Sequence, residues 1–211
     1  MPQIMESRTV QRAYNFELRA EQNEEYGDYI TGRPIVYDSK TDLGWFDEVI
    51  ERGALDKTDL KDVRFLVNHD TSMIPLARSR NNNANSTMQM SVDDNGMGIR
   101  VNLDTENNSD ARNLYSAIKR GDISGMSFMF SINDEEWEGL DTDHPTRHIR
   151  EIGQVLEVSA VTFPAYEATE ISARDKETLD SVKATLDSVK LLDSNKRALE
   201  LEKAKNRNKI F

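Results

Sequence analysis

Two runs of alternating side chains place the strongest limits on how this chain folds. Residues 126–132 read Met-Ser-Phe-Met-Phe-Ser-Ile, so every second side chain is large and apolar. Because successive strand residues point to opposite faces, this run predicts a strand with one buried face and Ser127 on the other. Residues 63–69 alternate as well, and they predict a strand that places His69 at the end of a buried row.

Other segments extend this β pattern. Residues 9–36 alternate between glycine and proline interruptions, which predicts two or three short strands. The sequence Asp-Asn-Gly at 94–96 predicts a tight turn that joins two strands into a hairpin. A polar cluster at 81–86 predicts the loop that leads into that hairpin.

Two helical segments are expected between these strands. Asn108 or Ser109 can cap a helix that runs through Lys119, and Gly121 follows as a stop signal. Residues 45–52 are predicted to form one or two helical turns that bury their apolar side chains.

Composition narrows the classes of function. The chain has 211 residues and a net charge of −11, and this charge disfavours binding to nucleic acid, which needs clustered Lys and Arg. Cysteine is absent, which excludes disulfides, thiolate zinc sites and cysteine nucleophiles. The chain shows neither a signal peptide nor an apolar run of about 18 residues. We therefore expect a soluble, cytosolic protein that does not bind membranes.

The character of the chain changes after residue 174. A repeat of seven residues places apolar side chains at a and d positions, and these are Leu179, Val182, Leu186 and Val189. Two regular heptads predict an amphipathic helix that pairs with another surface. Residues 196–209 carry a net charge of +4 against −15 for the preceding 195, so the two ends suit different partners. We expect one domain over residues 1–174 and a helical, charged tail over 175–211 that is flexible or self-cleaved.

Three residue types needed for serine hydrolysis occur on the predicted strands. Glu157 lies among apolar residues, and a buried carboxylate needs a partner such as an imidazole. Ser127, His69 and Glu157 would supply the nucleophile, the base and the group that orients the base. The alternative is that His69 is a core histidine and Ser127 a small strand residue. Ser124 is a rival nucleophile, but the glycine beside it favours a turn.

Metal sites are not expected. His144 and His148 are four residues apart, but Pro145 disfavours the helix that would bring them together. The acidic stretch 134–143 lacks the spacing of a calcium-binding loop. We predict neither a metal nor another cofactor.

Four motifs carry a resemblance to a known family. They are Ile-Glu-Arg-Gly-Ala-Leu at 50–55, the Asn-His-Asp run that ends at 70, Arg-Gly-Asp-Ile-Ser-Gly-Met-Ser-Phe at 120–128, and Leu-Glu-Val-Ser-Ala-Val-Thr-Phe-Pro-Ala-Tyr at 156–166. Over residues 6–174 the chain resembles the prohead (capsid maturation) proteases of tailed bacteriophages, which are similar to the herpesvirus assembly proteases.

This resemblance implies an α+β, mainly β fold: a closed antiparallel β-barrel surrounded by a few helices, here with a C-terminal helical tail. It implies that Ser127 is the nucleophile, His69 the general base and Glu157 the third member. The implied substrates are the scaffold protein or the scaffold-like segment of the major capsid protein, and the protease itself. The implied location is the assembling prohead in the host cytoplasm, and self-association as a homodimer is left open.

Two departures from the family pattern concern specificity. Met129 stands where the family often has glycine, and Ile-Pro-Leu-Ala-Arg at 74–78 replaces a more usual Leu-Gly-Arg. We expect an active enzyme with a narrower substrate groove. Backbone N–H groups or Arg78 are candidates for the oxyanion donors. The rival hypothesis is a non-catalytic capsid assembly or scaffolding protein on the same fold.

Overall fold

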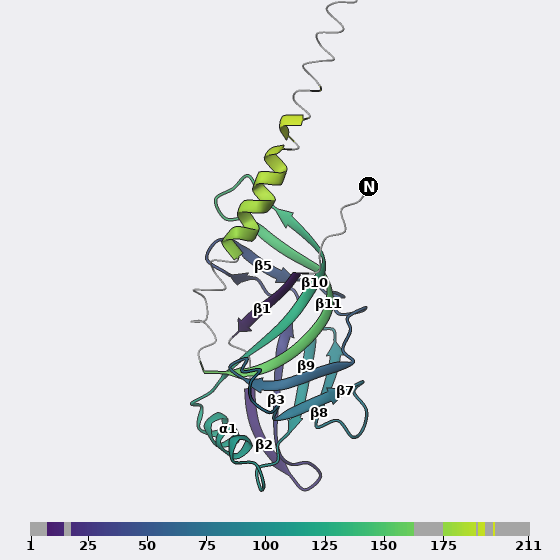
Figure 1. Ribbon diagram of the computed structural model, residues 1–211, viewed down its shortest axis with the longest axis vertical. Coiled ribbons are helices and arrows are strands. Elements are labelled where there is room, and N and C mark those ends of the chain that lie inside the picture. Colours follow the sequence, from purple (N-terminus) through teal and green to yellow (C-terminus); the bar gives the residue numbers. More distant parts are fainter. Residues whose placement is uncertain (1–7, 15–17, 163–174, 189, 193–195, 197–211) are drawn as a thin grey trace, which may run out of the picture.

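The computed structural model describes residues 8–14, 18–162, 175–188, 190–192 and 196. They form two β-sheets and two helices (Figure 1). The first sheet contains β1 (Arg8–Tyr14), β4 (Thr41–Asp42), β5 (Asp47–Ile50), β6 (Asp62–Val67), β7 (Ala77–Arg80), β10 (Gly125–Glu138) and β11 (Thr146–Val161). The second contains β2 (Leu18–Asn23), β3 (Gly27–Val36), β8 (Met88–Asp93) and β9 (Gly96–Asn102).

The hairpin of β10 and β11 organises the first sheet. Strand β1 pairs antiparallel with the outer edge of β10. The other edge of β11 is shared by two parallel partners, β5 along residues 146–149 and β6 along residues 157–160. Strand β11 therefore brings β6 and β10 to its two sides near its carboxyl end.

The expected closed antiparallel barrel is wrong. Among the described residues the first sheet runs β1-β10-β11-β5-β4 with β6 and β7 as a branch, and the second runs β2-β3-β9-β8. Neither sheet closes on itself. Strand β11 divides one edge between β5 and β6, both parallel to it, so its pairing departs from that of an antiparallel barrel. The mainly β character is confirmed.

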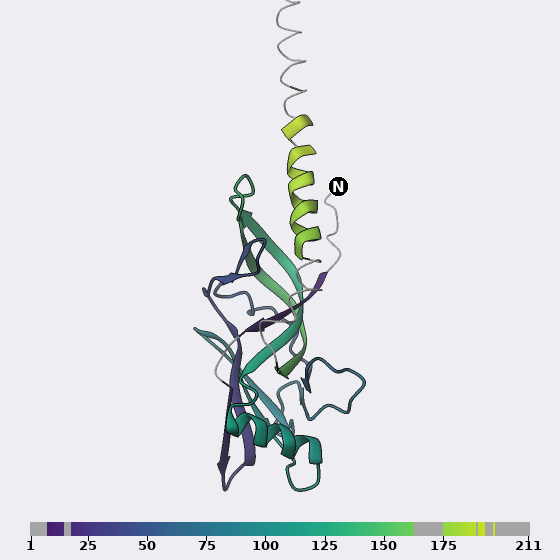
Figure 2. The ribbon, with the colours of Figure 1, turned by 90° about the vertical axis from the view of Figure 1, so that its left-hand side faces the viewer.

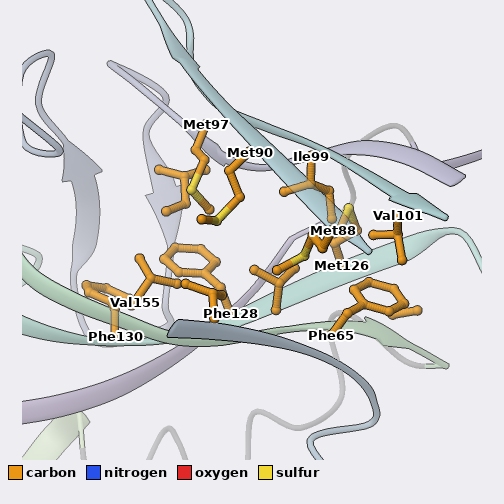
Figure 3. Close-up of a cluster of buried hydrophobic side chains, with 14 of the residues drawn as sticks. Phe65, Met88, Met90, Met97, Ile99, Val101, Met126, Phe128, Phe130 and Val155 are labelled. Atoms are coloured by element: carbon orange, nitrogen blue, oxygen red, sulfur yellow. The ribbon is translucent and has the colours of Figure 1, made fainter. Parts of the chain in front are cut away.

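The core lies between the two sheets (Figure 3). Methionine side chains from β8 and β9 meet phenylalanine rings from β6 and β10. The Phe128 and Phe130 rings stack with their centroids 4.8 Å apart. Methionine is unbranched and fills irregular gaps, which suits a core formed by two sheets whose strands run in different directions. Burial at about 25 cal/mol per Å² of apolar surface makes this core the main stabilising element.

The predicted helix and hairpin are confirmed, but the second helical segment is wrong. Helix α1 (Ser109–Arg120) is capped by the Asn108 side chain, and Gly121 ends it in a left-handed conformation. Strands β8 and β9 pair around the turn at 94–96. Residues 47–50 form β5 instead of a helix, with Glu48 and Ile50 buried and their neighbours half-buried. The helical reading assumes that Glu48 faces solvent, whereas an ion pair buries it.

The tail begins as a helix packed on the domain. Residues 175–188 and 190–192 are helical, and the helix leaves the end of the molecule opposite to α1 (Figures 1 and 2). Leu179 is buried, Val182 and Leu186 are half-buried, and Leu191 and Leu192 are exposed. Val189 and residues 197–211 lie outside the described residues. No described helix combines the length and hydropathy needed to cross a membrane.

Candidate active site

His69 follows strand β6 instead of ending it. The strand stops at Val67, and Asn68 and His69 adopt left-handed backbone angles, with φ of 49° and 57°. The Asn68 side chain fixes this turn against the end of β11, because its Oδ1 accepts the Thr162 N–H at 2.9 Å and its Nδ2 donates to Thr162 Oγ1 at 3.0 Å. The backbone conformation of this turn therefore determines where the imidazole points, and the alternation of side chains along β6 does not.

His69 and Glu157 form a short hydrogen bond. The distance from His69 Nδ1 to Glu157 Oε1 is 2.5 Å, and the side chains are 9% and 5% exposed. A carboxylate only accepts, so Nδ1 carries the proton of this hydrogen bond. This arrangement turns Nε2 to the opposite side of the ring, where a general base takes a proton.

Ser159 completes a cluster with these two residues. Its Oγ donates to Glu157 Oε2 at 2.6 Å and accepts the backbone N–H of His69 at 3.2 Å. Ser159 is fully buried. We call His69, Glu157 and Ser159 the triad cluster. These three hydrogen bonds join the turn after β6 to β11 or join two residues within β11.

Ser127 lies on β10 directly opposite Ser159 in the strand register. Directly opposite residues in antiparallel strands have Cα atoms about 4.5–5.5 Å apart, so the nucleophile candidate is next to the triad cluster. Its hydroxyl donates to the backbone carbonyl of Arg12 on β1 at 2.7 Å, and Ser127 is fully buried. The structure thus brings His69 and Glu157 into contact and places Ser127 opposite Ser159, with its hydroxyl bonded to β1.

A β-bulge separates this polar face from the core. The register of β10 and β11 shifts between Met129 and Phe130, so Glu157 opposes Met129 while Val155 opposes Phe130. Val155 is therefore in the core and lies on the face opposite to that of Glu157, although the two residues are two apart on the strand. The side chains of Asn133 and Ser131 lie over Gly153, and a Cβ there would lie 2.4 Å from Asn133 Oδ1, so these side chains would have to shift.

A second buried polar cluster lies farther along the same sheet. Arg12 donates to both oxygens of Glu48, at 2.5 and 2.8 Å, and to Asp175 Oδ1 at 3.2 Å. Arg147 donates to Glu48 at 3.4 Å and also pairs with Glu135. We call these five residues the Arg12 cluster. Burial raises the pKa of Asp175, and the charge of Arg12 opposes that shift.

Asp70, which follows His69, and Arg78, the candidate oxyanion donor, each bond to residues outside the triad cluster. Asp70 accepts hydrogen bonds from the hydroxyl and the N–H of Ser72, which lower the pKa of its carboxyl. The guanidinium of Arg78 donates to both oxygens of Asp62, at 2.6 and 2.8 Å. Neither Asp70 nor Arg78 is hydrogen-bonded to the triad cluster among the described residues. Ser124 is exposed just before β10.

The two remaining histidines lie at the other end of β11. His148 is on the strand and is close to Glu51 and Glu138, at 3.1 and 3.4 Å. His144 lies in the preceding loop, and its Nε2 forms a group of metal-ligand type with Asp42 and Asp47, whose donor atoms lie within 4.8 Å of one another. Lys40 Nζ is 3.0 Å from Asp47 and supplies a positive charge at this exposed group.

Sequence reasoning missed Ser159, Asn68 and the Arg12 cluster. Ser159 carries a usable signal, because it is two residues from Glu157 and so shares its face of the strand. Asn68 tolerates the left-handed conformation better than most residues. The Arg12 cluster joins five elements, and no local pattern connects them.

Comparison with known proteins finds a family model and solved structures that match the chain. The family model described as caudovirus prohead serine protease matches residues 14–184. The structure of the bacteriophage T4 capsid assembly protease, gp21, matches over 72% of this chain and 98% of that one, with 12% identity and a TM-score of 0.36. A likeness at that TM-score carries no weight for this chain. No curated protein matches the chain.

Proposed function

Since this chain belongs to the caudovirus prohead serine protease family, we propose that it is an active serine endopeptidase with Ser127 as nucleophile, His69 as general base and Glu157 as the orienting acid. The observation that carries the proposal is the 2.5 Å contact between His69 Nδ1 and Glu157 Oε1. A buried imidazole held by a carboxylate is the arrangement that activates a neighbouring hydroxyl.

The proposed mechanism follows from the positions of these atoms. Ser127 Oγ leaves the carbonyl of Arg12 and attacks the carbonyl carbon of the scissile bond, while His69 Nε2 takes the hydroxyl proton. Glu157 accepts from Nδ1 and stabilises the imidazolium that forms. His69 then gives the proton to the leaving amine, and water repeats the sequence on the acyl-enzyme. Because Ser127 is fully buried, the residues that cover it must move before a peptide reaches it.

The proposed substrates are the scaffold protein or the scaffold-like segment of the major capsid protein, together with the protease itself. The family description supports a role in prohead maturation, and we propose that the reaction occurs inside the assembling shell in the host cytoplasm. Met129 opposes Glu157 in the strand register and is partly exposed. We propose that its side chain narrows the groove at the nucleophile and restricts the substrate residues beside the cleaved bond.

The tail has a proposed role of its own. Its apolar positions and its basic end support a segment over 175–211 that tethers the enzyme to scaffold or capsid protein, or that the enzyme removes from itself. A chain that lacks residues 197–211 should enter proheads less often if the basic end is the tether. Normal incorporation of that shortened chain would contradict the tethering role.

The proposal is tested by intact mass after co-expression with the scaffold and capsid proteins. Wild-type protein should shorten itself or a partner, and Ser127→Ala should leave every chain at full length. Ser131→Ala is the matched control, because Ser131 lies on the same strand with the same orientation, and Ser124→Ala tests the rival nucleophile. Both controls should cleave as wild type does. Full-length chains throughout, in assembled proheads, would favour a non-catalytic assembly protein.

A further inference from the structure

The hydroxyl of Ser159 occupies a position that the three-residue mechanism leaves without a role. It bonds to Glu157 Oε2 at 2.6 Å and to the backbone N–H of His69 at 3.2 Å, and Glu157 Oε1 in turn contacts His69 Nδ1 at 2.5 Å. These contacts form a closed ring that starts and ends at His69. We propose that Ser159 is a positioning residue that holds both the carboxylate and the backbone of the general base; this inference rests on the proposed function.

The carboxylate needs such a second contact. Glu157 reaches His69 through a flexible side chain, and the bond to Nδ1 uses only one of its oxygens. A buried carboxylate oxygen without a donor loses a large part of its hydration energy. The Ser159 hydroxyl supplies that donor from two residues away on the same strand face, and so it fixes the rotation of the carboxylate that aims Oε1 at Nδ1.

The backbone of His69 needs an anchor as well. His69 has φ of 57°, a left-handed conformation that is unfavourable for L-residues. Its N–H points to Ser159 Oγ, so the same hydroxyl that orients the carboxylate also holds the turn that carries the imidazole. Ser159 lies opposite Ser127 on the neighbouring strand, which fixes the position of the base relative to the nucleophile.

A buried serine that merely fills space is the alternative reading, and the chain offers a matched control for it. Ser79 on β7 is fully buried like Ser159. Its hydroxyl makes no hydrogen bond within the described part of the chain. Ser79→Ala therefore removes a buried hydroxyl, as Ser159→Ala does, but removes no hydrogen bond to another described residue.

The first test is nuclear magnetic resonance of histidine ring nitrogens and protons in the Ser127→Ala protein, where no turnover occurs. The His69 signals are assigned by comparison with His144→Gln and His148→Gln. We expect one Nδ1–H tautomer with a strongly deshielded proton. Ser159→Ala should give mixed tautomers and lose that proton signal, and Ser79→Ala should change neither. An unchanged His69 ring in Ser159→Ala would overturn the proposal.

The second test is kinetic and uses the full-length chain in assembled proheads. Misplacement by about 1 Å costs up to about 100-fold in rate, so Ser159→Ala should lower kcat by 10- to 100-fold, with KM changed less than twofold. Ser159→Cys, a weak donor of similar size, should fall in between, and it serves in both tests if Ser159→Ala does not fold. Wild-type rates in both variants would overturn the positioning role.

The two tests separate the two claims. Changed tautomers in Ser159→Ala together with an inactive wild type would contradict the proposed protease and leave the positioning of His69 intact. An active wild type with an unaltered His69 ring in Ser159→Ala would leave the protease standing and remove Ser159 from the account.

Discussion

The triad cluster and the Arg12 cluster are both buried and polar, yet they are constructed in opposite ways. The triad cluster uses short contacts between β11 and the single turn that follows β6. The Arg12 cluster uses long side chains from β1, β5, β10, β11 and the tail helix. The first construction fixes atoms relative to one another, and the second ties separate elements together.

This difference has an energetic basis. Two guanidinium groups and three carboxylates are desolvated in the Arg12 cluster, and removing one partner from such a group leaves another charge buried and unpaired. In the triad cluster a substitution such as Glu157→Gln keeps the shape of the side chain and changes only which atoms donate and which accept hydrogen bonds. Damage to the triad cluster should therefore appear in the rate of catalysis, and damage to the Arg12 cluster should appear in stability.

The largest expected effect is that of Glu157→Gln on catalysis. The amide keeps the size of the carboxylate but favours the wrong imidazole tautomer, so kcat should fall by about 10⁴-fold. The midpoint of thermal unfolding should remain close to that of wild type. Cleavage rates in proheads and calorimetry of the purified protein provide the measurements. A stable variant with wild-type rates would remove Glu157 from the site.

Glu48→Ala should have the largest effect on stability. It leaves the guanidinium groups of Arg12 and Arg147 buried without their shared partner, which costs about 3–5 kcal/mol of unfolding free energy. Urea titration followed by fluorescence of Trp137 and Trp45 measures the loss. Glu151→Ala is the control, because its ion pair with exposed Lys57 should contribute far less. Equal losses of unfolding free energy in the two variants would contradict the proposal that the Arg12 cluster stabilises the fold by holding separate elements together.

Asp175→Asn should have a smaller effect that depends on pH. Burial raises the pKa of Asp175 in the folded chain, so the folded state binds the proton more readily than the unfolded state. Wild-type stability should therefore decrease as pH rises from about 3.8 through the raised folded pKa. Asp175→Asn should remove this decrease of the unfolding free energy with pH, because asparagine does not titrate. Identical slopes in the two proteins, measured by unfolding titrations from pH 3 to 7, would count against the burial of the Asp175 carboxyl.

The smallest effect is expected at an exposed pair in the second sheet. Arg33 donates to both oxygens of Asp93, and its hydrogen bonds lower the pKa of Asp93 to about 2. A lowered folded pKa gives stability that is present above about 3.8 and is lost as pH falls toward 2. Asp93→Asn should remove this contribution, so the variant should be slightly less stable than wild type at pH 5, and the difference should shrink as pH falls to 2. Thermal unfolding at pH 2, 3 and 5 distinguishes the two proteins.

Local patterns predicted the parts of this molecule that local physics determines. Asn108 and Gly121 mark the ends of α1 because capping depends on a few neighbouring residues, and the alternation around Ser127 identifies its strand. The pairing of β11 with both β5 and β6 was not predictable, because it depends on contacts about 100 residues apart. Residues 45–52 were misread as helical because the partners that bury Glu48 come from distant strands.

In the candidate site, too, local sequence patterns identified some features, and others depend on distant contacts. His69, Ser127 and Glu157 were identified from residue type and strand face, and the structure brings His69 and Glu157 together. The left-handed turn at Asn68 and His69 and the bulge at Phe130 were missed, since each breaks the alternation that the sequence pattern assumes. Ser159 was missed as well, because its double contact depends on the geometry of the turn.

Labelling of Ser127 by a fluorophosphonate probe is the most direct test of the account. The probe reacts only with a hydroxyl activated by a neighbouring base, and peptide mapping locates the modified residue. In assembled proheads the account predicts a label on Ser127 in the wild type and none in His69→Ala or Glu157→Gln, while Glu48→Gln protein that remains folded is labelled. No label in the wild type, or a label on Ser124, would contradict the assignment of nucleophile and base.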